Sequence, residues 1–546
     1  MKRAILLLSS SIMISAAPVA VDLKSKHLHN ESPNIPSQCY TKTKDTNGHI
    51  HNPCFACHID SQEPNYIDDW DLQLAYSFRE YLLKNHWSNL FIDRSKAVAA
   101  ISDDAIASYV KKSNYHDKGR LILAEKLRHL PEAWDVDGDK KWDGYIPDCY
   151  YDFDEEGFDR DTKGQMTGWR AFGYAPVLGT FWPTNGSTDD VLIRLPKAFR
   201  SLGGKCAKQT YKVNLLIVEA LIKQKDIESF PIDEKRYGVD LDKDKKLGMA
   251  KKIAFSYDPR NGQHMSYVGD AKDKAKIAAG LFPKGTEFLH SVRYIDSDAN
   301  GTIMIAPRMK ELRYAKKVAW ADYNTHQELI EEELKEGHDF PDRLEQFIGD
   351  NERGISNKRG WRYQGFIEDA KGDLRPQSYE ETLFCIGCHA SLGAVVDSTF
   401  SFARKLEKGA YHDGWFHWSQ KGLQNIKEPH TPDGRYEYTL YLEQNHAGDE
   451  FRGNAEVKGK FFDKDGNLNQ SLVKTLHHDI STLLLPSTKR ATTLNKAYKV
   501  IVNEQSFIYG RDAHVKPVKS VYEELKEDKS TGVKEAVRYY HDKSKL

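Results

Sequence analysis

Apolar side chains in the first 130 residues recur at the spacing of helices. Residues 67–91 place them on one face of a predicted helix, and two further helices are predicted over 93–112 and 117–129. Residues 21–53 differ, because they are rich in Pro, Asn and Ser and poor in apolar side chains. We expect that segment to be an extended lead-in.

The apolar pattern changes at Pro131. Short runs suited to strands are found at 191–195, 287–292 and 302–305, and the spacing in 209–224 predicts a helix. We therefore expect a domain of mixed strands and helices in the middle of the chain.

Helical spacing returns toward the end of the chain. The strongly charged stretch 323–337 predicts a helix with a solvated face. Further helices are predicted in 384–406, 470–484 and 491–507. Residues 436–462 are predicted to form strands, and the Lys- and Glu-rich tail after residue 520 is expected to fray.

These elements together predict an α+β fold with a separate domain at each end. We expect an N-terminal helical domain over 21–130, a mixed domain over 131–340 and a C-terminal, mostly helical domain over 341–546. A chain of 546 residues is too long for a single hydrophobic core, which favours several domains.

Composition narrows the classes of function. Hydrophobic residues make up 39% of the chain and charged residues 29%, but the charges nearly cancel and leave a formal net charge of −1. This balance argues against nucleic acid or an anionic membrane surface as the partner.

Residues 1–20 have the features of a secretory signal. Met1-Lys2-Arg3 is basic, an apolar run follows as far as Ala17, and small residues lie near the expected cleavage site. The run is shorter than the ~20 residues of a membrane-spanning helix. Because the first cysteine is Cys39, no lipid anchor is expected at the cleavage site. The sequence thus predicts an exported, periplasmic protein with no membrane anchor.

Two short motifs carry the candidate chemistry. They are Cys54-Phe55-Ala56-Cys57-His58 and Cys385-Ile386-Gly387-Cys388-His389. Two thiols three positions apart, followed at once by an imidazole, form the attachment pattern of c-type haem, in which each thiol adds to one vinyl group and the histidine binds iron. A zinc half-site or a redox dithiol is the alternative, but a redox dithiol needs no following histidine, and zinc needs four ligands in all.

The motifs predict two haem c groups, one in each end domain. The motif cysteines Cys54, Cys57, Cys385 and Cys388 would hold the porphyrins, and His58 and His389 would be the proximal iron ligands. For the distal positions we prefer His86 and His417 to the methionines, all of which lie in the middle domain once the signal is excluded.

Three cysteines remain outside the motifs: Cys39, Cys149 and Cys206. An odd number in an oxidising compartment leaves one unpaired, and the sequence permits all three pairings. We expect a disulfide between Cys149 and Cys206.

Acidic residues alternate in one Gly-containing loop. Asp135, Asp137, Asp139 and Asp143 are spaced so that their carboxylates can converge, as oxygen ligands do around calcium. Position twelve of the loop is Ile146 rather than the Glu of an EF-hand, and a metal-free Asp-rich turn is the alternative. Weaker relatives of this loop are found at 240–244, 296–300 and 463–469.

The two haem motifs resemble those of dihaem c-type cytochromes, which include electron carriers and the bacterial dihaem peroxidase group with its MauG-like and rubber-oxygenase-like members. The resemblance covers the ten motif residues alone. It implies a periplasmic cytochrome that transfers electrons to or from redox-partner proteins or a small-molecule donor or acceptor. The alternative is a dihaem oxidoreductase with one open catalytic haem and one haem that relays electrons. The sequence does not assign any catalytic residue of such an enzyme beyond the motifs. A third interpretation, a binding or sensory module with structural haem, has no supporting motif.

Overall fold

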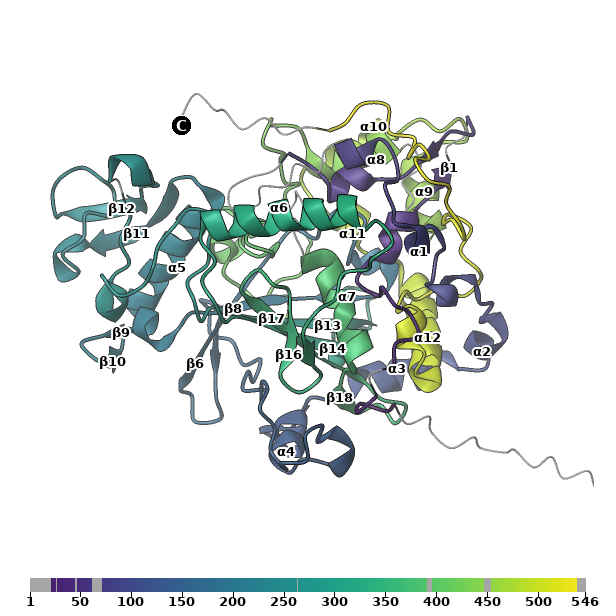
Figure 1. The fold of residues 1–546 in the computed structure, drawn as a ribbon, viewed down its shortest axis with the longest axis horizontal. Helices are drawn as coiled ribbons and strands as arrows, with labels where there is room; N and C mark the ends of the chain where they lie inside the picture. Colours follow the sequence, from purple (N-terminus) through teal and green to yellow (C-terminus); the bar gives the residue numbers. More distant parts are fainter. Residues whose placement is uncertain are drawn as a thin grey trace, which may run out of the picture.

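A large antiparallel sheet forms the centre of the molecule (Figure 1). The computed structural model describes residues 21–25, 27–44, 47–60, 71–262, 264–389, 395–445 and 453–537. Within these residues the sheet has ten strands in the order β15-β16-β17-β14-β13-β8-β6-β5, with β18 beside β17 and β7 beside β13. The bounds are β5 Phe158–Arg160, β6 Met166–Phe172, β7 Thr188–Asp189, β8 Val191–Arg194, β13 Glu287–Ser297, β14 Ile303–Lys317, β15 Gly349–Asp350, β16 Gly354–Ser356, β17 Trp361–Glu368 and β18 Leu374–Pro376.

The hairpin of β13 and β14 is the longest pair of the sheet. Its register places Phe288 opposite Ala315 and Ile295 opposite Ile305. The strands predicted at 191–195, 287–292 and 302–305 are therefore confirmed, and β14 is much longer than the apolar run that predicted it. It continues because β13 and β17 flank it on both sides and accept its backbone hydrogen bonds.

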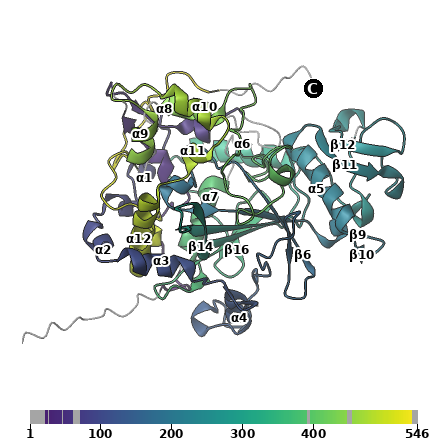
Figure 2. The same cartoon turned by 180° about the vertical axis from the view of Figure 1, so that it is seen from behind.

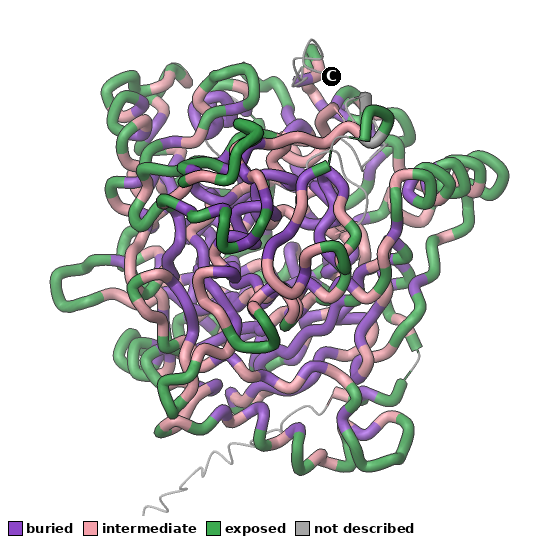
Figure 3. Tube along the Cα trace, turned by 90° about the vertical axis from the view of Figure 1, so that its left-hand side faces the viewer, coloured by how far each residue is buried: buried purple, intermediate pink, exposed green. Residues whose placement is uncertain are grey.

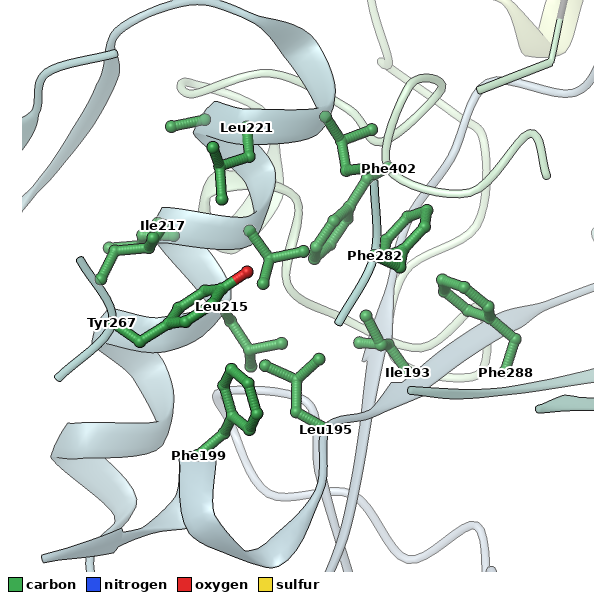
Figure 4. Close-up of a cluster of buried hydrophobic side chains, with 14 of the residues drawn as sticks. Ile193, Leu195, Phe199, Leu215, Ile217, Leu221, Tyr267, Phe282, Phe288 and Phe402 are labelled. Carbon is green, nitrogen blue, oxygen red and sulfur yellow. The ribbon is translucent and has the colours of Figure 1, made fainter. Parts of the chain in front are cut away.

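Helix α5 (Lys208–Lys223) confirms the helix predicted at 209–224 and is buried on nearly every side. Figure 4 shows Leu215 of α5 beside Leu195, just after β8, and Leu221 further along the helix, with Phe402 from the C-terminal half facing the same cluster. The outer side of α5 contacts the hairpin of β11 (Ile227–Asp233) and β12 (Met249–Ile253). This cluster joins the sheet to the left-hand lobe of Figure 1.

The remaining helices surround the sheet (Figures 1 and 2). Their bounds are α1 Glu80–Leu83, α2 Ser95–Ala99, α3 Asp103–Lys111, α4 Ile122–Arg128, α6 Tyr323–Asp339, α7 Tyr379–His389, α8 Glu437–Asn445, α9 Ala455–Phe461, α10 Gln470–Leu476, α11 Ser481–Leu484 and α12 Thr488–Glu504. Three small hairpins complete the strands: β1 Thr43–Lys44 with β2 Ile50–His51, β3 His116–Asp117 with β4 Arg120–Leu121, and β9 Ser201–Leu202 with β10 Lys205–Cys206. Helix α6 crosses in front of the sheet in Figure 1 and keeps most of its side chains in solvent, as the charge pattern predicts.

Two predictions of secondary structure are wrong. The helix expected over 67–91 is reduced to the single turn of α1, since the amides of Tyr76 and Asn85 instead donate to carbonyl groups of the C-terminal tail. The strands expected over 436–462 are the helices α8 and α9. Helix α8 is buried on nearly all sides, so its apolar residues do not show a helical repeat that could be read from the sequence.

The described part of the C-terminal tail is ordered rather than frayed. It lies along the N-terminal segment: the amide of Lys42 donates to the carbonyl of Ser520 at 2.7 Å, and that of Asn52 to Thr531 at 2.8 Å. The apolar side chains between them form one cluster: Tyr40, Tyr76, Trp87, Leu90, Val518, Val521, Tyr522 and Leu525. The tail's charge therefore lies on its solvent side, while its few apolar residues bind the other end of the chain.

The α+β class is confirmed, because helices and a large sheet occur together. Figure 3 shows buried backbone throughout the interior and exposed loops at the surface. The predicted division at residues 130 and 340 stays a prediction. In the parts of the chain that the structure describes, no helix has the length and apolar character needed to cross a membrane.

Candidate functional site

Both cysteine–histidine motifs open into one cavity of about 560 Å³. The motif side chains on its wall are Cys54, Cys57, His58, Cys385, Cys388 and His389. The opposite wall is formed by β13, β14 and residues 174–182. The sequence alone placed the motifs in separate domains, whereas the fold brings them to a shared space.

The first motif is a tight turn. A short 3₁₀ helix, Cys54–Ala56, ends as the amides of Cys57 and His58 both donate to the carbonyl of Cys54, at 3.0 and 2.9 Å. This turn holds the two thiols on the cavity side. The buried Gln73 links the motif to the tail, since its amide donates to the carbonyls of His58 and Val537.

The second motif is the last turn of α7. Cys385 and Cys388 are three positions apart on this helix and so share one face. Nδ1 of His389 lies 2.9 Å from the carbonyl oxygen of Ser398, which can only accept, so Nδ1 carries the proton and Nε2 is the nitrogen left for a ligand. The ring also stacks on Tyr363, with centroids 4.9 Å apart.

The extended lead-in predicted before the first motif runs along α7. Glu380 accepts hydrogen bonds from the amides of His29 and Asn30, at 3.0 and 2.7 Å. At Gly387, between the two motif cysteines, an added Cβ would lie 2.4 Å from the carbonyl oxygen of Asn34. The glycine thus lets the lead-in pass directly over the second motif.

Thiols from the two motifs influence one another. Burial and, to a lesser degree, the nearby Cys388 raise the pKa of Cys57 to about 12. Burial likewise raises the pKa of Cys388 to about 11, against the opposing charge of Arg313. Cys39, a thiol outside the motifs that also lies on the wall, has its pKa raised first by burial and then by thiols of both motifs, among them Cys54 and Cys388. All of these groups are protonated thiols at neutral pH.

The motif histidines are neutral at physiological pH. Burial lowers the pKa of both His58 and His389 to about 4. Neutral imidazole is the form that binds a metal ion.

The sheet side of the cavity carries both apolar and polar side chains. Strand β13 turns Phe288, His290 and Val292 toward the cavity, as the two-residue repeat of a strand requires. Nδ1 of His290 lies 2.5 Å from the carbonyl oxygen of Asp190, and burial lowers its pKa to about 4. Sequence reasoning missed His290, although a histidine inside a predicted strand was the available signal.

A buried acid lies beside His290. Nε2 of His290 is 3.7 Å from the carboxylate of Asp189, which accepts a hydrogen bond from Tyr174. Burial raises the pKa of Asp189 to about 8, against the effect of the Tyr174 hydrogen bond. Asp189 is thus mostly protonated at neutral pH and adds little charge to the wall.

Two arginines, one on β14 and one after α12, pair with a glutamate on the same wall. Arg313 lies 3.0 Å from the carboxylate of Glu311, and Arg511 lies 2.7 Å from it. Burial alone would raise the pKa of Glu311, but the two arginines hold it at about 2. This group of three side chains therefore carries one more positive than negative charge.

The structure does not bring the predicted distal ligands to this cavity. Nε2 of His86 lies 3.0 Å from the carbonyl oxygen of Tyr81, and its ring stacks on the Tyr81 ring. His417 lies behind the sheet side, where its Nε2 is 3.1 Å from the carboxylate of Asp190. It lines a separate cavity of about 30 Å³. Among the described residues on the shared wall, His290 is the histidine outside the motifs.

The expected disulfide is not formed. All seven cysteines are described, and all are free thiols. Cys149 is buried in the core beneath the sheet, while Cys206 lies exposed on the small hairpin β9–β10.

The acidic loop comes together only in part. Oxygens of Asp135 and Asp137 lie within 4.8 Å of one another and of Glu352, which belongs to the turn between β15 and β16. The carboxylate of Asp139 instead accepts the amide of Lys141, and Asp143 pairs with Arg353 at 3.1 Å. Because Glu352 is more than 200 positions away, local spacing could not identify it.

Comparison with known proteins gives a family. A family model with the description "-like lipoprotein" matches residues 23–480. An uncharacterized lipoprotein of Aquifex aeolicus (strain VF5) is 32% identical over 575 aligned positions, which cover 94% of this chain and 92% of that protein. No solved structure matches the chain.

These matches correct the assignment made from the motifs. Neither one is a cytochrome or a peroxidase, so the resemblance to dihaem c-type cytochromes does not hold as a family relationship. The predicted functions that followed from it, electron transfer and dihaem oxidoreductase activity, are overturned with it. Ten motif residues do not define a family when the sequence as a whole matches a different family. The expectation that the chain lacks a lipid anchor also finds no support in a lipoprotein family.

Proposed function

We propose that this chain, which belongs to the lipoprotein family and is therefore exported, binds two tetrapyrroles covalently in its shared cavity, one through each motif, on the periplasmic side of the membrane. The proposal concerns binding of the cofactor through the motif residues and does not restore the electron-transfer function.

One observation carries the proposal: two Cys-x-x-Cys-His motifs from opposite ends of the chain open into the same cavity. Each motif supplies two thiols and one imidazole, which is the donor set for one haem c.

The state of the donor groups agrees with this chemistry. The thiols are protonated, and a thioether forms when a thiol S–H adds across a vinyl double bond, with the sulfur on one carbon and the hydrogen on the other. His389 is neutral and held in one tautomer by the Ser398 carbonyl. A bound haem would supply iron for the imidazoles of His58 and His389.

The walls of the cavity suit a tetrapyrrole. Phe288, Val292, Trp361 and Tyr363 present apolar and aromatic surface for the faces of a porphyrin ring. Arg313 can bind carboxylates, because a guanidinium group pairs with them through two parallel hydrogen bonds. A tetrahedral zinc site is less well supported, since among the described residues no three thiol or imidazole groups lie within 4.8 Å of one another.

Cofactor content of the full chain tests the proposal. The chain would be exported from a bacterial host with and without haem-maturation proteins, and intact mass and denaturing haem stain would be measured. Wild-type protein is expected to retain two haem groups after denaturation. The pairs C54A/C57A and C385A/C388A should each retain one, and the quadruple variant none.

Matched cysteine variants complete the test. Cys149→Ala and Cys206→Ser remove thiols that lie away from the cavity and should leave haem content unchanged. Wild-type protein that has only its apo mass when a control cytochrome matures in the same cells would overturn the proposal, as would zinc in place of porphyrin.

A further inference from the structure

Outside the cavity, the acidic loop and the β15–β16 turn form a compact acidic site. One carboxylate oxygen from each of Asp135, Asp137 and Glu352 lies within 4.8 Å of the other two. Asp135 and Glu352 are buried, whereas Asp137 is at the surface. Three carboxylates at this distance repel one another unless a cation lies between them.

The buried carboxylate of Glu352 is the decisive feature. Its side chain is 0% exposed, and its Oε1 accepts the amide of Asp143 at 2.9 Å. Its Oε2 is buried and has no hydrogen-bond partner. A buried carboxylate oxygen without a donor is costly, and a metal ion is the kind of group that removes this cost.

The loop is held in place by hydrogen bonds within it and to the sheet. Asp135 accepts the amides of Gly138 and Lys140, at 2.8 and 3.2 Å, which fixes the turn. The amide of Tyr145 donates to Gln364 on β17, and the side chain of Gln364 donates in turn to the carbonyl of Asn351. The loop and the Glu352 turn are thus held against each other by the sheet.

We propose that Asp135, Asp137 and Glu352 bind a calcium ion that fastens the 135–143 loop to the β15–β16 turn. Several carboxylate oxygens in a flexible loop suit calcium, which accepts six to eight oxygen ligands, better than magnesium, which demands strict octahedral geometry. Glu352 takes the role that position twelve fills in an EF-hand, from a distant part of the chain.

Arg353 is the competing cation. Its guanidinium group pairs with Asp137 and Asp143, and with Asp350 at 3.3 Å. Its side chain is 38% exposed, so it can turn to solvent, whereas Glu352 cannot. Arg353 faces the outer oxygens of the cluster and leaves the buried Oε2 of Glu352 without a partner.

The second acidic group provides a matched control. Glu234, Asp240 and Asp242 are also within 4.8 Å of one another, but both oxygens of Glu234 accept backbone amides, from Leu241 at 2.6 Å and Gly248 at 2.9 Å. A buried acid whose two oxygens are satisfied does not need a cation. The oxygen of this group that lacks a partner, Oδ1 of Asp240, belongs to a residue that is only half-buried, so this group carries no proposal.

Terbium luminescence and thermal unfolding of the full chain test the calcium site. Trp142 lies in the loop itself and can transfer excitation energy to a bound terbium ion. We expect tryptophan-sensitised terbium emission that calcium displaces and magnesium does not, and a higher unfolding midpoint in calcium than in a chelator. Glu352→Gln and Asp137→Asn should each weaken terbium binding at least about tenfold.

Control variants make each outcome decisive. Asp240→Asn should retain the emission, and Asp137→Asn, at an exposed position, keeps the test valid if Glu352→Gln does not fold. Arg353→Gln should bind calcium at least as tightly as wild type. The proposal is overturned if wild-type protein shows no emission and no calcium effect, if it binds only after Arg353→Gln, or if Asp240→Asn rather than Asp137→Asn abolishes binding.

Discussion

Nζ of Lys317 lies 2.5 Å from one carboxylate oxygen of Asp397 and 2.6 Å from the other, and neither side chain is exposed to solvent. Lys317 ends β14, while Asp397 belongs to the segment that follows the second cysteine–histidine motif. Asp397 also accepts the amide of Phe282 at 2.9 Å. This pair therefore connects the central sheet to the chain that carries Ser398, the partner of His389.

Breaking this pair on one side should be strongly destabilising. Lys317→Met would leave the carboxylate of Asp397 buried without its cation, and we expect a loss of about 3–5 kcal/mol in the free energy of unfolding. The double variant K317M/D397L should lose clearly less, since no charge is left unpaired. Urea unfolding curves measure both values. Equal losses in the single and the double variant would contradict this interpretation of the pair.

Stability should depend on the protonation of Asp189. Its pKa in the folded protein is about 8, raised by burial from its ordinary value near 3.8, so the folded state binds a proton that the unfolded state has lost. The resulting stability is complete below pH 4 and is lost as the pH rises toward 8. Asp189→Asn cannot lose this proton. The free energy of unfolding of this variant, relative to that of wild type, should therefore rise by at least about 2 kcal/mol between pH 4 and pH 9.

The free energy of unfolding would be measured against pH for wild type and for Asp189→Asn. A constant difference between the two curves from pH 4 to pH 9 would contradict this role of Asp189. Asp139→Asn is a suitable control, because Asp139 is exposed. The difference between that variant and wild type should stay nearly constant above pH 5.

The C-terminal tail should hold the first motif in place. A chain that ends at Lys519 lacks the carbonyl groups that accept the amides of Lys42, Asn52 and Tyr76. We expect hydrogen exchange of these three amides to accelerate at least about tenfold, which corresponds to about 1.4 kcal/mol of local stability. Amides within the β13–β14 hairpin should keep their protection. Unchanged exchange near the first motif would show that the tail contributes no stability there.

Gly387→Ala should cost stability because of its close neighbours. The new Cβ would lie 2.4 Å from the carbonyl oxygen of Asn34 and 3.1 Å from Cδ of Pro36, so the lead-in must move away from α7. We expect a loss of about 1–3 kcal/mol. Gly459→Ala on α9 is the matched control, since no atom lies within 4 Å of its Cβ position and alanine favours a helix. A midpoint of thermal unfolding for Gly387→Ala that equals or exceeds that of wild type would contradict the tight contact.

The sequence alone determined those features that depend on neighbouring residues. The spacing of Cys54, Cys57 and His58 identifies a donor set, and short apolar runs identify β8 and β13, because both patterns lie within a few neighbouring positions. Helix α5 could be predicted for the same reason. Helix α8 could not, since it is buried on nearly all sides and gives no periodic pattern.

Only the tertiary structure decided which distant residues meet. It brought the two motifs to one cavity, turned His290 rather than His417 toward it, and placed Glu352 beside Asp135. These contacts depend on the order and register of the strands in the sheet. Backbone pairing between distant segments sets both, and such pairing cannot be predicted from the spacing of neighbouring residues. Short motifs therefore identify the chemical groups of a site, while the tertiary structure determines which of these groups lie together.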